Sequence, residues 1–142
     1  MMTIAVSSFE GLGLSADMLA QIGKAGYSCP TPIQRMAIPH ALAGRDVIGC
    51  AQTGTGKTAA FVIPIIERLA DGRGTRALIL VPTRELAMQV EKVIDQLGCR
   101  RGVGAALVIG GASMQQQERA LRQGPAIVVG TPGRVLDHMW RG

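Results

Sequence analysis

A lysine and a threonine stand at the end of a glycine-rich run, directly before an apolar stretch. The run reads Ala51-Gln52-Thr53-Gly54-Thr55-Gly56-Lys57-Thr58. Bare glycines let successive backbone N–H groups turn inward around phosphate oxygens, and a following helix adds its positive end. At this spacing Lys57 reaches the β- and γ-phosphates, and the Thr58 hydroxyl is a ligand for Mg²⁺. The run predicts a triphosphate-binding loop with Lys57 and Thr58 as candidate catalytic residues, although Ala51 replaces the first glycine of the strict pattern.

Two other interpretations of this loop remain open. A glycine turn can simply join a strand to a helix. Gly54, Gly56 and Ala59 also satisfy the G-x-G-x-x-G/A pattern of a dinucleotide site. That site requires an acidic residue at the end of the next strand to hold a ribose. The sequence there is Val81-Pro82-Thr83-Arg84, which has no carboxylate, so triphosphate binding is favoured.

A glutamine upstream of the loop has two uses. Gln34 follows Thr31-Pro32 and can form a capping box with Thr31 at the start of a helix. A fixed carboxamide can also donate to N7 and accept from N6 of adenine. Both can hold at once, so Gln34 is predicted as a helix cap and as a candidate adenine ligand.

Three later turns each open a predicted helix. They are Pro82–Ala87, Gly110–Ser113 and Thr131–Arg134. The first N–H groups of a helix can face an anion. Arg84 and Arg134 are unfavourable there because they oppose the helix dipole, and a negatively charged partner would offset this cost. Ordinary helix capping explains each turn taken singly, whereas their joint appearance behind a phosphate loop predicts an extended phosphate backbone lying across them.

Short apolar runs must position these turns. They are continuous rather than alternating, as in strands covered on both faces. The runs are Asp46–Cys50, Arg76–Val81, Ala105–Ile109 and Ala126–Val129. The amphipathic stretches that follow them are Lys57–Ala70, Arg84–Leu97, Ser113–Gln123 and Gly133–Trp140. Strands alternating with helices predict βαβ units, a largely parallel sheet flanked by helices, and the α/β fold class.

A helical prelude precedes this pattern. Ser15 is predicted to cap a helix over Asp17–Lys24, and Thr31-Pro32 to open another that closes near Gly44. We therefore expect residues 1–44 to form the prelude and residues 45–142 to form the nucleotide-binding domain. The glutamines of Gln115–Gln117 are expected to form a solvated helix face.

The composition of the chain indicates which classes of partner and which cellular environment suit it. The chain has 15 Lys and Arg against 10 Asp and Glu, and this net charge of +5 suits a polyanion. Its aromatic residues, only 3% of the chain, argue against gripping nucleic acid by a row of stacked bases. No apolar run approaches the roughly 20 residues of a membrane span, and the start lacks the basic region of a secretory signal. Widely spaced cysteines favour neither a disulfide framework nor a metal pair, which predicts a reducing cytoplasm.

Together these segments resemble the motifs of DEAD-box RNA helicases, in the same order and with similar spacing over nearly the whole chain. Phe9 with Gly26–Gln34 is similar to the Q motif, and Ala51–Thr58 to motif I. Pro82–Ala87 resembles motif Ia, Gly110-Gly111 the GG motif, and Thr131–Arg134 motif Ib.

The resemblance implies a RecA-like domain that binds ATP with Mg²⁺ and contacts RNA. Gln34 would read adenine, Phe9 or Tyr27 would pack near the base, and loop 51–58 would hold the triphosphate and Mg²⁺. The residues expected to contact the RNA sugar–phosphate backbone are Thr83, Arg84, Gly110, Gly111, Thr131, Gly133 and Arg134. Such contacts position a strand without reading its sequence.

The resemblance also implies that further parts belong to the whole protein. The family's next element, an apolar strand ending in Asp-Glu-Ala-Asp, would come after Gly142, followed by a Ser-Ala-Thr motif and a second RecA-like domain. These parts hold Mg²⁺, orient the attacking water and supply an arginine finger, on which phosphoryl transfer depends. We expect an ATP-dependent RNA helicase that closes two domains on RNA, of which this chain is the start, incomplete at its C-terminus.

Two consequences and several alternatives accompany this interpretation. The 142-residue chain is expected to bind adenine nucleotide without hydrolysing it. A sheet without its later strands is expected to expose apolar surface or an unpaired edge, and copies of the chain to associate.

A non-catalytic nucleotide- or RNA-binding module, complete as it stands, is the alternative. A P-loop kinase or GTPase is disfavoured because no Walker B carboxylate is present, and DNA in place of RNA remains open.

Overall fold

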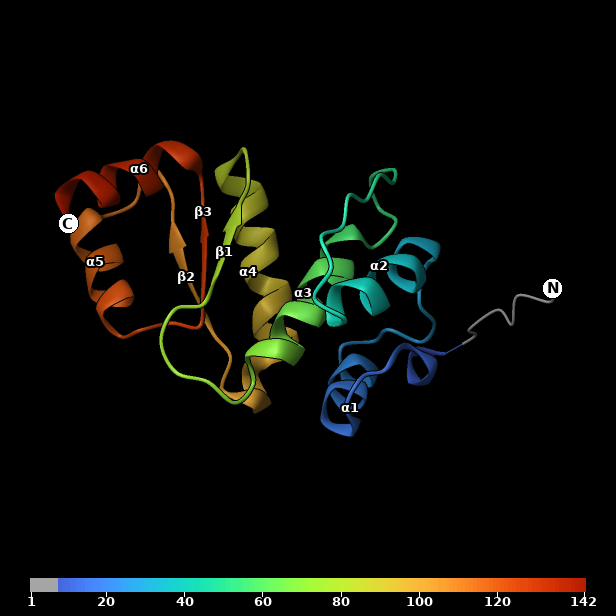
Figure 1. Ribbon diagram of the computed structural model, residues 1–142. Coiled ribbons are helices and arrows are strands. Elements are labelled where there is room, and N and C mark those ends of the chain that lie inside the picture. Colours follow the sequence, from blue (N-terminus) through green and yellow to red (C-terminus); the bar gives the residue numbers. More distant parts are fainter. Residues whose placement is uncertain (1–7) are drawn as a thin grey trace. The chain divides into compact units, whose positions relative to one another are not determined.

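The computed structural model describes residues 8–142 and has the predicted α/β architecture, in which helices come first and then alternate with strands (Figure 1). The elements, with η marking a 3₁₀-helix, are η1 (Phe9–Leu12), α1 (Ala16–Lys24), α2 (Pro32–Leu42), α3 (Lys57–Leu69), β1 (Ala77–Leu80), α4 (Arg84–Gly98), η2 (Cys99–Arg101), β2 (Ala105–Val108), α5 (Met114–Arg122), β3 (Ile127–Gly130) and α6 (Pro132–Arg141). The first seven residues of the predicted prelude lie outside the described residues. In the described part, no helix is long and apolar enough to span a membrane.

The chain divides into two compact units. The first ends at Arg68 and the second begins at Leu69, at the last turn of α3. This boundary does not coincide with the division after residue 44 expected from the motifs. The motif-based domain boundary stays a prediction.

The first unit is helical, and its helix starts follow the sequence. The Ser15 hydroxyl accepts a hydrogen bond from the Met18 N–H at 3.3 Å and so caps α1 as predicted. Glu67 of α3 accepts hydrogen bonds from the Ser15 N–H at 3.2 Å and from its hydroxyl at 3.1 Å. A carboxylate at a helix N-terminus is favourable, so these bonds tie the start of α1 to the helix that follows the phosphate loop.

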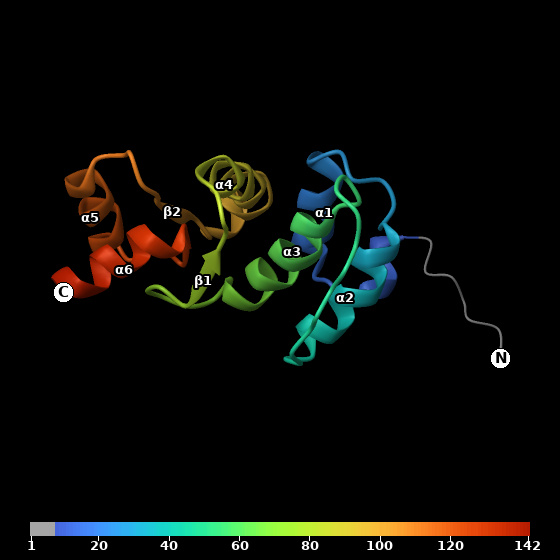
Figure 2. The same cartoon turned by 90° about the horizontal axis from the view of Figure 1, so that it is seen from above.

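The second unit holds a three-stranded sheet of order β1-β3-β2, and both pairs are parallel as predicted. The central strand β3 is buried along its whole length, which its continuous apolar run indicated. Helix α4 runs along one face of this sheet and contacts β2 and β3 (Figures 1 and 2). Val90, Ile94 and Leu97 form its buried stripe, at helical spacing.

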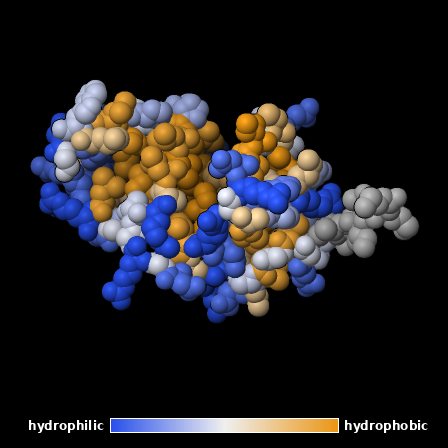
Figure 3. Space-filling model, viewed as in Figure 1, coloured by the Kyte–Doolittle hydropathy of each residue, from blue (hydrophilic) through white to orange (hydrophobic). Residues whose placement is uncertain are grey.

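On strand β1, the face of the sheet opposite α4 is apolar and open to solvent. Leu78 and Leu80 on β1 are 55% and 54% exposed, and β1 pairs on one side only within the described residues. Figure 3 shows hydrophobic side chains gathered over this sheet. An exposed apolar surface and an unpaired strand edge are thus both present, as expected. Association of copies through this surface stays a prediction.

The predicted strand over Asp46–Cys50 is wrong. Residues 45–50 form neither helix nor strand, and Val47 and Ile48 are 42% and 97% exposed. A strand is stabilised by a hydrogen-bonded neighbour, and the strands among the described residues pair with one another in the second unit. Apolar composition alone does not create a strand without a hydrogen-bonded neighbour.

Candidate nucleotide and nucleic-acid sites

The predicted phosphate loop lies at the N-terminus of α3, which begins at Lys57. Gly54 and Gly56 have φ angles of +82° and +81°, a conformation that glycine adopts without steric cost. Backbone N–H groups that precede and open a helix can bind an anion together. The loop therefore has both the backbone conformation and the helix end that phosphate binding requires.

The loop is closed by its own side chains. Lys57 Nζ donates a hydrogen bond to the Ala51 carbonyl at 2.6 Å, and the Thr55 hydroxyl donates to the Gln52 carbonyl at 2.5 Å. The Lys57 side chain consequently reaches from the end of the loop back to its first residue. Lys57 is exposed, so it can leave the Ala51 carbonyl for a phosphate without disturbing a packed core.

Gln34 connects α2 to this loop. Its side chain is only 1% exposed. Oε1 accepts from the Thr31 N–H at 3.0 Å, which confirms the Gln34 arm of the predicted capping box, and Nε2 donates to the Gly56 carbonyl at 3.1 Å. A Cβ on Gly56 would collide with Gln34 Nε2, so glycine is needed there for this approach as well as for its φ. The adenine contact of Gln34 stays a prediction.

The two aromatic residues assigned to the base form a pair. The rings of Phe9 and Tyr27 meet edge to face, with centroids 6.5 Å apart and an interplanar angle of 77°. Phe9 is 4% exposed, whereas Tyr27 is half-buried. Tyr27 is therefore the more accessible of the two residues, and Phe9 packs against its ring.

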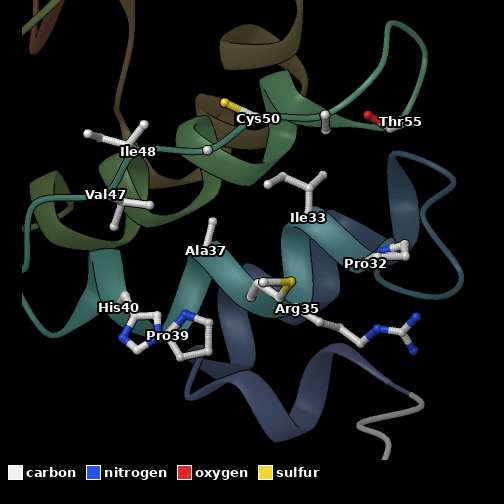
Figure 4. Close-up of a pocket in the computed structure, with 13 residues that line it drawn as sticks. Pro32, Ile33, Arg35, Ala37, Pro39, His40, Val47, Ile48, Cys50 and Thr55 are labelled. Atoms are coloured by element: carbon white, nitrogen blue, oxygen red, sulfur yellow. The ribbon is translucent and has the colours of Figure 1, made fainter.

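A cavity of about 520 Å³ lies between α2 and the extended segment that leads into the loop (Figure 4). Its walls are mainly apolar and include Ile33 of α2 and Val47 and Ile48 of the segment, while Arg35 points away from the segment (Figure 4). Ala51 and Thr55 belong to its lining, but Gln34, Tyr27 and Lys57 do not. The cavity therefore shares Ala51 and Thr55 with the phosphate loop, whereas Gln34, Tyr27 and Lys57 lie outside its lining.

The three later turns follow the carboxyl ends of parallel strands in the second unit. Such ends share one edge of the sheet, where ligands collect in α/β folds. The Thr83 hydroxyl caps α4 by accepting from the Leu86 N–H at 3.2 Å, and the Ser113 hydroxyl accepts from the Gln116 N–H at 3.4 Å. Thr131 and Pro132 open α6 in the predicted positions. Side-chain capping is thus present at the turns that open α4 and α5, whereas Thr131 precedes α6 without a side-chain cap hydrogen bond.

Both predicted arginines meet the glycine turn after β2. Gly111 has a φ of +75°, and a Cβ placed on it would lie 2.5 Å from Arg84 Nη1. Arg134 Nη1 donates to the Ala112 carbonyl at 3.0 Å. By contrast, a Cβ on Gly110 or Gly133 would meet nothing within 4 Å. The fold brings Arg84 and Arg134 to the same turn, Gly110–Ala112, and we call this group the arginine cluster.

One residue of this cluster was missed by sequence reasoning. Gln117 is 4% exposed, so the expected solvated face is wrong at this position, although Gln115 and Gln116 are exposed. Gln117 Nε2 donates to the Ile109 carbonyl at 2.8 Å, and its Oε1 accepts from Arg134 Nη1 at 3.2 Å. The signal was its helical spacing, three residues after Met114 and four before Leu121, on the apolar side of α5.

A family model described as DEAD/DEAH box helicase matches residues 31–142. The chain belongs to the DEAD/DEAH box helicase family. This result confirms the resemblance of its motifs to DEAD-box helicases. As a DEAD/DEAH box helicase chain, it is 51% identical over 138 residues to the ATP-dependent RNA helicase DeaD of Escherichia coli strain K12. The match covers 96% of the chain but 22% of that relative, so the chain spans about a fifth of its length.

Solved structures of DEAD-box proteins share the fold. A DEAD box protein from the hyperthermophile Methanococcus jannaschii is 43% identical with a TM-score of 0.90, over 96% of this chain and 38% of that one. The RNA-helicase Prp28 from Chaetomium thermophilum, solved bound to ADP, is 41% identical with a TM-score of 0.86. That match covers 99% of this chain and 36% of the Prp28 chain. The DEAD-box chain therefore has the predicted RecA-like α/β fold.

Proposed function

We propose that this chain binds ATP with Mg²⁺ through loop 51–58 and contacts the RNA backbone through the turns after β1, β2 and β3. The proposal makes it the nucleotide- and RNA-binding part of an ATP-dependent RNA helicase. In the whole protein, a second RecA-like domain would close with it on one RNA strand. The cytoplasmic location expected from the cysteines remains part of this proposal.

The observation that carries the nucleotide half is the loop at the start of α3. Gly54 and Gly56 have left-handed φ angles, and the Lys57 ammonium already lies across the loop on the Ala51 carbonyl. A γ-phosphate would replace that carbonyl as the partner of Lys57, and Thr58 would supply a hydroxyl ligand to Mg²⁺. Gln34 would face adenine while its bond to the Gly56 carbonyl keeps the loop in register.

The RNA half is supported by the arginine cluster. Arg84 lies against Gly111, and Arg134 is bonded to Ala112, so two guanidinium groups flank one turn. Guanidinium groups and backbone N–H groups bind phosphate oxygens without reading bases. The proposed contacts of Thr83, Gly110, Thr131 and Gly133 would come from the same turns.

We expect the 142-residue chain to bind fluorescent ADP but to hydrolyse no ATP, with or without single-stranded RNA. The phosphate loop is present, whereas the carboxylates that would hold Mg²⁺ and orient water come later in the family's pattern. Phosphate release should therefore equal that of the Lys57→Ala variant.

RNA-stimulated phosphate release that Lys57→Ala abolishes would contradict this expectation. The same assay on the full-length polypeptide distinguishes a helicase from a non-catalytic binding module. RNA-stimulated hydrolysis there supports the helicase, and nucleotide binding without hydrolysis supports a non-catalytic binding module.

A further inference from the structure

We propose that Gln117 is a positioning residue that holds the Arg134 guanidinium for its phosphate contact. The inference rests on the proposed RNA contact of Arg134. It adds a buried residue from α5, outside the turns that resemble family motifs, to the group of residues on which RNA binding depends.

The hydrogen bonds of Gln117 join three parts of the second unit. Its Nε2 donates to the carbonyl of Ile109, which directly follows β2. Its Oε1 accepts from Arg134 Nη1 at 3.2 Å and lies 3.0 Å from His138 Nε2, both on α6. Because Gln117 is 4% exposed, its carboxamide is largely shielded from water, and these bonds fix it in one orientation.

Arg134 is held by one end of its guanidinium. Both hydrogens of Nη1 are used, one by the Ala112 carbonyl at 3.0 Å and one by Gln117 at 3.2 Å. Nε faces Asp137 at 3.8 Å. Within residues 8–142, Nη2 makes no hydrogen bond. The two acceptors thus hold Nη1 and leave Nη2, on a side chain that is 15% exposed, as the donor that we assign to a phosphate oxygen.

The amide chemistry at position 117 suits this task better than the alternatives. A carboxylate would accept from Arg134 but would place an oxygen against the Ile109 carbonyl and neutralise the charge that phosphate needs. A thioether of similar size would fill the space and hold neither partner. Only a neutral side chain with both a donor and an acceptor fixes Arg134 and leaves its positive charge for RNA.

The test is a double-mutant cycle in the full-length polypeptide, read by fluorescence anisotropy of a labelled single-stranded RNA at constant salt. We expect Gln117→Met and Arg134→Ala each to weaken RNA binding about tenfold, a change typical of one charge-assisted hydrogen bond. In the Arg134→Ala background, Gln117→Met should change the affinity less than about twofold, because its effect passes through Arg134. Gln116→Met, on the exposed side of α5, is the matched control and should bind RNA as the parent does.

The outcomes separate the inference from the function on which it rests. If Arg134→Ala leaves RNA affinity unchanged, the RNA contact is wrong and the inference falls with it. If Arg134→Ala weakens binding but Gln117→Met does not, or weakens it equally in both backgrounds, only the positioning role is wrong. ADP affinity without RNA should be the same in all variants.

A second variant keeps the inference testable where Gln117→Met fails to fold. Arg134→Lys retains the charge but lacks the planar guanidinium. Its ammonium cannot reproduce the fixed geometry in which two acceptors hold one nitrogen and another nitrogen remains for phosphate. It should lose about as much RNA affinity as Arg134→Ala. Parental affinity in Arg134→Lys would show that charge alone suffices and would overturn the positioning role.

Discussion

Replacing Lys57 by alanine is expected to weaken adenine-nucleotide binding about 10- to 100-fold. A hydrogen bond from an ammonium to a phosphate contributes about 1.5–3 kcal/mol, which corresponds to this range of dissociation constants. Lys57 is exposed and its hydrogen bond in the structure goes to the Ala51 carbonyl, so the free energy of unfolding should change by less than about 0.5 kcal/mol. Titration with fluorescent ADP and Mg²⁺ measures the first quantity, and urea unfolding the second.

Lys92→Ala is the matched control for Lys57→Ala. Lys92 is an exposed lysine of α4, in the second unit, so its replacement removes the same charge without touching the loop. It should bind ADP as the parent chain does. Equal weakening in both variants would indicate a net-charge effect and would remove Lys57 from the site.

Replacing Gly111 by alanine is expected to weaken RNA binding about tenfold, as the loss of one guanidinium–phosphate contact would. The new Cβ would lie 2.5 Å from Arg84 Nη1, so the guanidinium must shift from its present position beside the turn. Because φ is +75° at this position, the side chain should also cost about 1 kcal/mol in the free energy of unfolding. RNA anisotropy on the full-length polypeptide and urea unfolding of the chain measure the two effects.

Gly104→Ala serves as the control for Gly111→Ala. Gly104 is exposed, lacks a positive φ, and has open space where a Cβ would be added. Its variant should keep the parental RNA affinity and unfold at equal or slightly higher urea concentration. Parental RNA affinity in Gly111→Ala would mean that Arg84 beside the turn plays no part in RNA binding.

The local parts of the structure followed from the sequence because their causes are local. The Ser15 cap of α1 and the bond from the Thr31 N–H to Gln34 each act within one helical turn, and the glycines of loop 51–58 adopt a conformation available chiefly to glycine. The continuous apolar run of β3 likewise indicated a strand covered on both faces. Parallel pairing then followed from the helices that separate the strands.

The errors arose where distant residues decide the outcome. The apolar run 46–50 resembles a strand, yet it lies extended and unpaired because a strand depends on neighbours that its own residues do not specify. Gln117 was expected to be one of three solvated glutamines, whereas it is buried and bonded to the distant Ile109 carbonyl, Arg134 and His138. The approach of Arg84 to Gly111 also depends on the sheet that aligns the two turns.

A crystal structure of the chain with ADP and Mg²⁺ tests the central claim most directly. We expect the β-phosphate at the start of α3, within hydrogen-bonding distance of the backbone N–H groups of residues 54–58, with Lys57 Nζ moved from the Ala51 carbonyl to a phosphate oxygen. A loop that stays closed by the Lys57–Ala51 hydrogen bond at saturating ADP, with the nucleotide bound elsewhere or absent, would contradict it.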